Sequence, residues 1–136
     1  MKKTKKILNW LIGGISFSYF LAIVFPSFLF ANKLEYKSFS VHYHSNDINT
    51  EELKLVLDKS ESLLYNTELF KKGISQDIFI CNGYSEFTFF ALMSRKAFAV
   101  NYPIFQNIFI SKSSVLQNYI LRNGKENNKR TLSGVI

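Results

Sequence analysis

The feature that most constrains this chain is an apolar run from Ile7 to Ala31, which contains no Asp, Glu, Lys, Arg or His side chain. As a helix with a rise of ~1.5 Å per residue, the run would span about 37 Å, and the hydrocarbon core of a bilayer is about 30 Å thick. Gly13, Gly14 and Pro26 would weaken a helix in water. In lipid they are tolerated, because breaking backbone hydrogen bonds costs more there. The run therefore predicts a transmembrane helix over residues 7–31.

A cleaved signal peptide is the alternative to a retained anchor. The apolar region of a signal peptide usually has about 7–15 residues and ends at a small-x-small site. Cleavage after Ala31 would place Leu29 at the −3 position, and leucine is not small. The sequence therefore favours a retained signal anchor. By the positive-inside tendency, the lysine-rich residues 1–6 are expected to stay in the cytoplasm, which places residues 32–136 outside.

The formal net charge of +7 is concentrated at two places in the chain. Residues 1–6 supply four of the positive charges, and residues 122–130 supply the other three. Residues 33–121 contain nine basic and nine acidic side chains, so their net charge is zero. A nucleic-acid-binding domain needs a basic face in its folded body. Nucleic acid is therefore not an expected partner.

The first half of the outer region predicts a strand followed by a helix. In "YKSFSVHYHS" (36–45), Phe39, Val41 and Tyr43 alternate with Ser40, His42 and His44, as in a half-buried strand. The following helix is expected to begin after Asn49, which is a good N-cap, with Glu52 completing a capping box. Its apolar stripe consists of Leu53, Val56, Leu57, Leu63 and Leu64. The segment "TELFKKG" should end this helix, with Gly73 available for a left-handed turn.

The second half predicts further strands between helices. Strands are expected in "QDIFICNG" (76–83), "KAFAVNYP" (96–103) and "QNIFISKS" (106–113). Helices are expected in "YSEFTFFALM" (84–93), with Phe87, Phe90 and Ala91 on one face, and in residues 113–124, stopped by Gly124. Residues 123–130 read as a loop or linker, and the last residues as the start of another helix. This order predicts an α+β or α/β domain with helices packed on a small mixed sheet.

His42 and His44 are the two histidines of the chain, and they would lie on the same side of a strand. Two ligands of one metal ion are geometrically possible there, with Asp47 or a distant carboxylate as a third. A catalytic zinc ion needs about three protein ligands and a structural one about four, and the spacing specifies neither set. The favoured interpretation is that both histidines are outward-facing polar residues. No metal ligand or cofactor is predicted.

Cys81, Ser85 and Glu86 lie near a strand-to-helix turn, where nucleophiles are often found. The turn lacks the flanking glycines of a nucleophile elbow, and no base is specified beside it. Ser85 is better explained as an N-cap, and Cys81 as a small core residue. Cys81 is also the single cysteine, so no internal disulfide is expected. No phosphate-binding loop is present, and no catalytic residue is predicted.

The layout of "FSVHYHS", the capped helix, "DIFICNGYSEFTFF", "NIFISK" and "RTLSGVI" resembles the region that leads into the active-site helix of zincin-type metallopeptidases. In that family a mixed sheet precedes a helix carrying His-Glu-x-x-His, whose histidines bind zinc and whose glutamate activates water. The resemblance covers residues 38–136 and implies fold and ancestry. The sequence contains no His-Glu-x-x-His, so no family metal ligand can be placed on it.

One expectation is that the chain is the front part of a longer reading frame that encodes this motif downstream, because an apolar helix start is an unusual end. The alternative is a natural apolar C-terminus that frays. Together these observations predict a cytoplasmic tail (1–6), a transmembrane helix (7–31) and a catalytically incomplete extracytoplasmic domain (32–136). The bilayer is the expected partner. A module that docks an envelope protein and a zinc hydrolase completed by further sequence are the alternatives.

Overall fold

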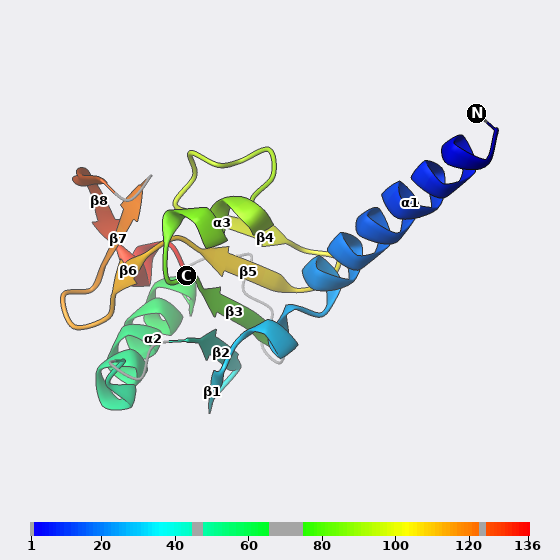
Figure 1. Ribbon diagram of the computed structural model, residues 1–136. Helices are drawn as coiled ribbons and strands as arrows, with labels where there is room; N and C mark the ends of the chain where they lie inside the picture. Colours follow the sequence, from blue (N-terminus) through cyan, green and yellow to red (C-terminus); the bar gives the residue numbers. More distant parts are fainter. Residues whose placement is uncertain (1, 45–47, 66–74, 123–124) are drawn as a thin grey trace.

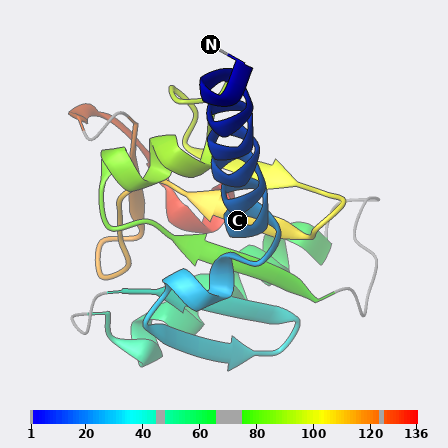
Figure 2. The same ribbon diagram turned by 45° about the vertical axis from the view of Figure 1, so that its right-hand side comes forward.

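The computed structural model describes residues 2–44, 48–65, 75–122 and 125–136, and the fold is α+β as predicted (Figure 1). A long helix, α1 (Lys2–Val24), projects from a body that contains a mixed five-stranded sheet and a smaller three-stranded one. The N-terminus lies at the far end of α1, and the C-terminus lies in the body (Figures 1 and 2).

The helix predicted over residues 7–31 ends earlier than expected, at Val24. Phe25 precedes Pro26 and has φ −124° and ψ 61°, outside the helical region. Proline disfavours a helical conformation in the residue before it, which explains the early end. The chain continues as a short 3-10 helix, η1 (Pro26–Leu29), and then enters the sheet.

The five-stranded sheet has the order β1-β2-β3-β5-β4. Its strands are β1 (Asn32–Tyr36), β2 (Phe39–Tyr43), β3 (Gln76–Ile80), β4 (Ala99–Tyr102) and β5 (Asn107–Ile110). The three central strands β2, β3 and β5 are parallel, and the edge strands β1 and β4 are antiparallel to their neighbours. The predicted strands are therefore present, and β1 is an additional one. It forms a hairpin with β2 through a tight turn in which Lys37 has φ 54°.

The smaller sheet contradicts two predictions, the helix over 113–124 and the loop over 123–130. It consists of β6 (Ser113–Ser114), β7 (Tyr119–Arg122) and β8 (Lys125–Thr131). Asn118 has φ 47°, which interrupts any helix, and its side chain bonds Ser133 through both Nδ2 (3.1 Å) and Oδ1 (3.0 Å). The predicted terminal helix is a single 3-10 turn, η2 (Leu132–Gly134). Gly73 and Gly124 lie outside the described residues.

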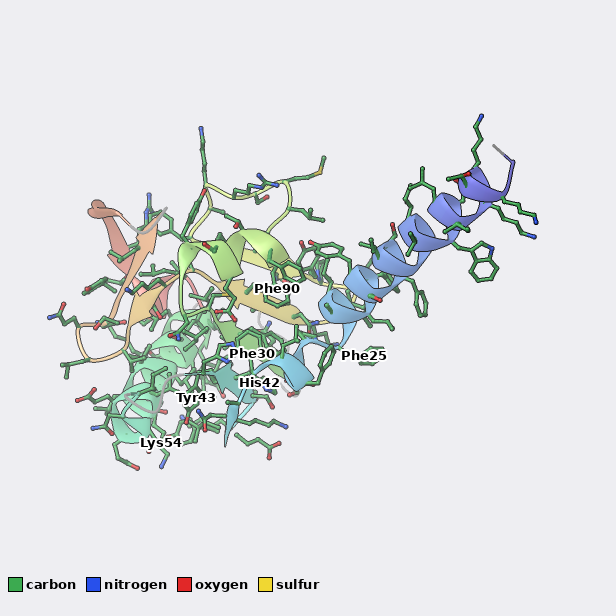
Figure 3. The ribbon with its side chains drawn as sticks, viewed as in Figure 1. Phe25, Phe30, His42, Tyr43, Lys54 and Phe90 are labelled. Carbon is green, nitrogen blue, oxygen red and sulfur yellow. The ribbon has the colours of Figure 1, made fainter. Side chains whose placement is uncertain are left out.

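The two faces of the five-stranded sheet differ in chemistry, because alternate residues of each strand point to opposite sides. One side, here called the aliphatic face, is packed against the helix α2 (Thr50–Tyr65). The other, the aromatic face, is covered by the helix α3 (Tyr84–Phe90), by Ile23 of α1 and by Phe30. In Figure 3, Phe30 and Phe90 lie on the side where α1 ends, whereas Tyr43 and Lys54 lie toward α2.

The helix α2 begins as its sequence predicts. The N–H of Glu51 donates to Oδ1 of Asn49 at 3.0 Å, which confirms Asn49 as the N-cap. Leu53, Val56 and Leu57 are buried in the aliphatic core. Leu63, which was assigned to the same stripe, is instead 47% exposed, because it lies in the last turn of the helix.

The helix α3 begins at Tyr84, two residues earlier than an N-cap at Ser85 requires, so that prediction is wrong. Gly83 occupies the N-cap position with an extended backbone. The carboxylate of Glu86 accepts a hydrogen bond from the N–H of Asn82 at 2.7 Å, and this bond satisfies a donor ahead of the helix without any cap from Ser85. Phe87, Phe90 and Ala91 are buried together on one face, as predicted.

Candidate functional site

An open cleft of about 350 Å³ lies at the carboxyl ends of β2 and β3 and just beyond β5. The carboxyl edge of parallel strands is where open sheets with helices usually bind ligands, and the volume is in the range of small-molecule sites. The cleft is lined by residues that follow these strands, by the start of α2 and by the segment around β6: Tyr43, His44, Ile48, Asn49, Glu52, Ile80, Cys81, Asn82, Lys112, Ser113, Ser114, Val115 and Leu116.

His44 is held in one orientation at the edge of this cleft. Its Nε2 lies 2.6 Å from Oε1 of Glu86, and its ring stacks on Phe30 with 4.5 Å between centroids. The second carboxylate oxygen of Glu86 is fixed by the N–H of Asn82. A carboxylate that accepts a hydrogen bond from an imidazole in this way fixes the orientation of the ring and selects its tautomer. The His44–Glu86 pair can therefore present a positioned hydrogen-bonding group to a ligand.

His42 lies on the same face as His44 but has a structural role. It is 5% exposed and stacks on Phe79 at 4.6 Å between centroids. Its Nε2 lies 3.5 Å from Oδ1 of Asp77. Burial lowers the pKa of the His42 imidazole below its ordinary value, and Asp77 partly opposes that shift.

The prediction that both histidines face outward is therefore wrong. They do share one side of the strand, but the aromatic face is covered, so His42 is buried and His44 half-buried. Each histidine also contacts a different carboxylate. Among the residues that the structure describes, no three His, Cys, Asp or Glu side chains are grouped as a metal site would need. Asp47, the possible third ligand, lies outside those residues.

Cys81 and Ser85 do not form a nucleophilic centre with Glu86. Cys81 is 1% exposed, and burial, with a smaller effect of Glu86, raises the pKa of its thiol well above the usual range. A buried thiol that stays protonated is a poor nucleophile, so Cys81 is a core residue, as the sequence indicated. The backbone oxygen of Ser85 accepts a bond from Thr88 Oγ1. The structure brings Glu86 to His44 instead.

The opposite wall of the cleft carries polar groups that the sequence interpretation did not single out. Glu52 comes from the first turn of α2, and Lys112 and Ser113 come from the segment after β5. Ser113 Oγ is buried and has no hydrogen-bond partner within the described part of the chain. The position of Lys112 and Ser113 directly after a buried strand was the available signal. The cleft therefore offers groups of both charges and an unpaired hydroxyl.

Comparisons of the chain with protein-family models, with curated proteins and with solved structures find no match. A functional assignment therefore depends on the geometry of the molecule. Two features carry most information: the cleft with its His44–Glu86 pair, and the way in which α1 is joined to the body.

Proposed function

We propose that this chain is a single-pass membrane protein that retains its N-terminal helix, with residues 1–6 in the cytoplasm and the α+β domain outside. The length and composition of α1 support the membrane assignment, since they are those of a membrane-spanning helix. Of its most apolar window, 6% is buried, whereas the core helix of a soluble protein would be largely buried. The lysines of residues 1–6 support the cytoplasmic location of the tail.

The observation that carries the proposal is the integration of α1 into the core of the domain. The buried side chain of Asn107 donates through Nδ2 to the carbonyl oxygens of Ile23 at 3.0 Å and Val24 at 3.4 Å. Ile23 and Phe30 are buried in the aromatic core beside Phe79. A leader removed after Ala31 would take both side chains and both acceptors with it. Retention of the helix is therefore favoured over cleavage.

On this proposal the domain is a catalytically incomplete relative of a zinc metallopeptidase that binds a ligand in its cleft. The mixed sheet is the architecture that the resemblance implied, which supports the relationship. His44 and Glu86 are fixed at the edge of the cleft, which supports the binding of a ligand there. The cleft, with Lys112 and Glu52 on its far wall, suits a small polar ligand that carries charges of both signs.

The alternative, a module that docks an envelope protein through its aromatic helix or sheet edge, has less support. Phe87 and Phe90 of α3 are buried and therefore cannot contact a partner, and the exposed Phe89 packs edge to face on Tyr19 of α1. Along the edge strand β1, Lys33 and Glu35 are exposed, and charged side chains discourage pairing with another strand.

Topology and retention can be tested together in intact cells. The full chain with Leu55→Cys, an exposed position on α2, should react with a membrane-impermeant maleimide, whereas Lys5→Cys should react only after lysis. The native Cys81 is buried and serves as the unlabelled background. The intact mass of the purified protein should include residues 1–31. A mature chain beginning at Asn32, or labelling of Lys5→Cys alone, would overturn the proposal.

The binding assignment is tested by metal content. The full chain, purified in detergent and dialysed against micromolar zinc, should contain far less than one equivalent of the metal. Stoichiometric zinc that survives dialysis against a weak chelator would show a complete metal site, and the alternative of a zinc hydrolase would replace the proposal.

A further inference from the structure

The depth of the body relative to the bilayer follows from the length of α1. If the helix enters the hydrocarbon core at Ile7, a thickness of about 30 Å at ~1.5 Å per residue is used up near the end of α1. Val24 is its last residue. The outer boundary of the hydrocarbon core therefore lies close to the point where the chain leaves the helix. This step rests on the proposed membrane-spanning role of α1.

The body, however, reaches back along the helix beyond that boundary. Tyr19 donates a hydrogen bond to the backbone oxygen of Phe89, and the two rings meet edge to face at 5.0 Å between centroids. Phe20 contacts Phe105 with 6.3 Å between centroids. Tyr19 precedes Val24 by five residues, which corresponds to about 7.5 Å along the axis. The parts of the body that touch Tyr19 and Phe20 are therefore at the depth of the outer acyl chains.

Those parts of the body expose large apolar side chains to their surroundings. We define the apolar rim as Phe25, Phe89, Leu92, Met93 and Ile104. Met93 is 101% exposed and Ile104 is 87% exposed. Contact between water and several such large apolar side chains is unfavourable. The connection from α3 to β4, which carries Leu92 and Met93, projects on the side toward which α1 runs (Figures 1 and 2).

The rim is continuous with the membrane-spanning helix. Phe89 and Tyr19 line one open, mainly apolar groove together with Gly14, Ile15 and residues further along α1. The surrounding charges fit a lipid surface, since residues 87–106 contain the basic Arg95 and Lys96 and no acidic side chain. Apolar side chains at the boundary with basic residues beside them are typical of segments that lie in the interfacial layer.

We propose that the apolar rim is inserted into the outer interfacial layer of the bilayer, so that the domain lies on the membrane and is held there at several points besides α1. Leu92, Met93 and Ile104 enter the region of the upper acyl chains, and Arg95 and Lys96 face the phosphate groups of the lipid.

Tryptophan scanning with depth-specific quenching tests this arrangement. The full chain is reconstituted into phosphatidylcholine vesicles with some phosphatidylglycerol, in which the phosphatidylcholine is either plain or brominated high on its acyl chains. Met93→Trp and Ile104→Trp are each placed in a Trp10→Phe background, and both positions are exposed, so the fold is preserved. Leu55→Trp, exposed on α2, is the matched control. The wild-type protein, with Trp10 in α1, reports the anchor itself.

Brominated lipid should remove roughly half or more of the emission at positions 93 and 104, as expected for side chains buried ~5–10 Å into the interface. Position 55 should be quenched by aqueous iodide instead. Iodide quenching at 93 and 104 equal to that at 55, with Trp10 quenched by brominated lipid, would overturn the rim and leave the anchor intact. Loss of quenching at Trp10 would overturn both. Protection from both quenchers at 93 and 104 would mean that a protein covers the rim, which also overturns the proposal.

Discussion

The two faces of the five-stranded sheet are built from the same strands but are covered in different ways. Ile108 and Ile110 point to the aliphatic face, and Phe109 between them points to the aromatic face. The aliphatic face is covered by α2, a contiguous segment of 16 residues, together with Val115, Ile120 and Leu132 from the C-terminal part of the chain. The aromatic face is covered by α1, η1 and α3, which are separated by much of the chain. The cover that α2 supplies could be predicted from its helical periodicity, whereas cover supplied by distant segments could not.

The difference also divides the molecule by environment. The aliphatic face needs nothing from residues 1–31, while the aromatic face includes Ile23 and Phe30 and carries the acceptors of Asn107. The aromatic face is therefore where α1 and the α+β body become one cooperative unit. Disturbing each face separately should give different outcomes.

Removal of residues 1–31 should have the largest effect on stability. It removes part of the aromatic core and leaves the residues of the aliphatic core in place. Burial of Ile23 and Phe30 contributes roughly 1.5–3 kcal/mol each, and the hydrogen bonds that Asn107 donates to Ile23 and Val24 contribute about 0.5–1.5 kcal/mol each. Their total approaches the ~5–15 kcal/mol by which a domain is stable. The shortened chain should aggregate on gel filtration and show no cooperative unfolding in urea.

Two substitutions in the full chain separate this effect from the loss of the anchor. Phe30→Ala, in the aromatic core, should lower the free energy of unfolding by about 3–5 kcal/mol, while Phe28→Ala, at an exposed position, should change it little. A monomeric chain beginning at Asn32 with the urea midpoint of the full protein would show that the two parts are independent.

The second test compares neighbouring residues on opposite faces. Phe109 stacks on Phe90 at 4.3 Å and on Phe79 at 5.1 Å between centroids, and both Phe109 and Ile110 are fully buried. Phe109→Ala should cost about 3–5 kcal/mol and Ile110→Ala about 2–5 kcal/mol, with the aromatic stack adding roughly 1 kcal/mol to the former. Urea unfolding in detergent measures both. A larger decrease in the free energy of unfolding for Ile110→Ala than for Phe109→Ala would contradict the expectation that the aromatic face contributes more at this position.

The third test measures how stability depends on pH. The buried imidazole of His42 should make the stability of the aromatic face depend on pH. Burial lowers the pKa of His42 in the folded protein, so between this lowered value and about 6.5 the unfolded chain binds more protons than the folded one. Stability should therefore be greatest above the unfolded pKa and fall as the pH decreases from 7.5 to 5.5. One proton gives at most about 1.4 kcal/mol per pH unit.

His42→Phe keeps a ring on Phe79 and removes the titrating group. Its free energy of unfolding, measured by urea titration at each pH, should depend less on pH than that of the wild type. If the free energy of unfolding depended equally on pH in the two proteins, the titration of His42 would not be the cause of the pH dependence.

The smallest expected effect concerns the cover of the aliphatic face. Asn49→Ala removes the acceptor for the N–H of Glu51 at the start of α2 and should cost about 1 kcal/mol. Asn49→Asp keeps an acceptor and should be close to neutral. Thermal unfolding followed by circular dichroism compares the two variants, and equal melting temperatures for both would argue against the cap.

The parts of the fold that could be predicted are those with local signals. The alternation in "FSVHYHS" and the capped stripe of α2 are properties of short segments, and the strand and the capped helix are both confirmed, although His42 is buried and Leu63 is exposed. The same alternation marks β1, where Lys33 and Glu35 are exposed, but its position directly after the apolar run concealed it. The smaller sheet was missed because Ile120 and Leu121 fit a helix as well as a strand. The left-handed Asn118 decides between them.

The candidate site was only half accessible from the sequence. His44 and Glu86 were each noted, but they are separated by 42 positions, and their pairing depends on the parallel register of β2 and β3 and on where α3 starts. His42 is buried and stacks on Phe79 of the neighbouring strand β3, a contact that depends on the pairing of the two strands. The alternation of residues within one strand does not show which other segment of the chain packs against that strand.

The hydrogen bonds from Asn107 fix the last turn of α1 to the domain, and we propose that α1 spans the bilayer. Because of this rigid connection, a change in the tilt of α1 also tilts the domain. A bilayer thinner than the apolar length of α1 would make that helix lean, as hydrophobic mismatch requires, and the outer body would lean by the same angle. Lipid composition would then change the direction in which the cleft beside His44 faces, without any change within the domain itself.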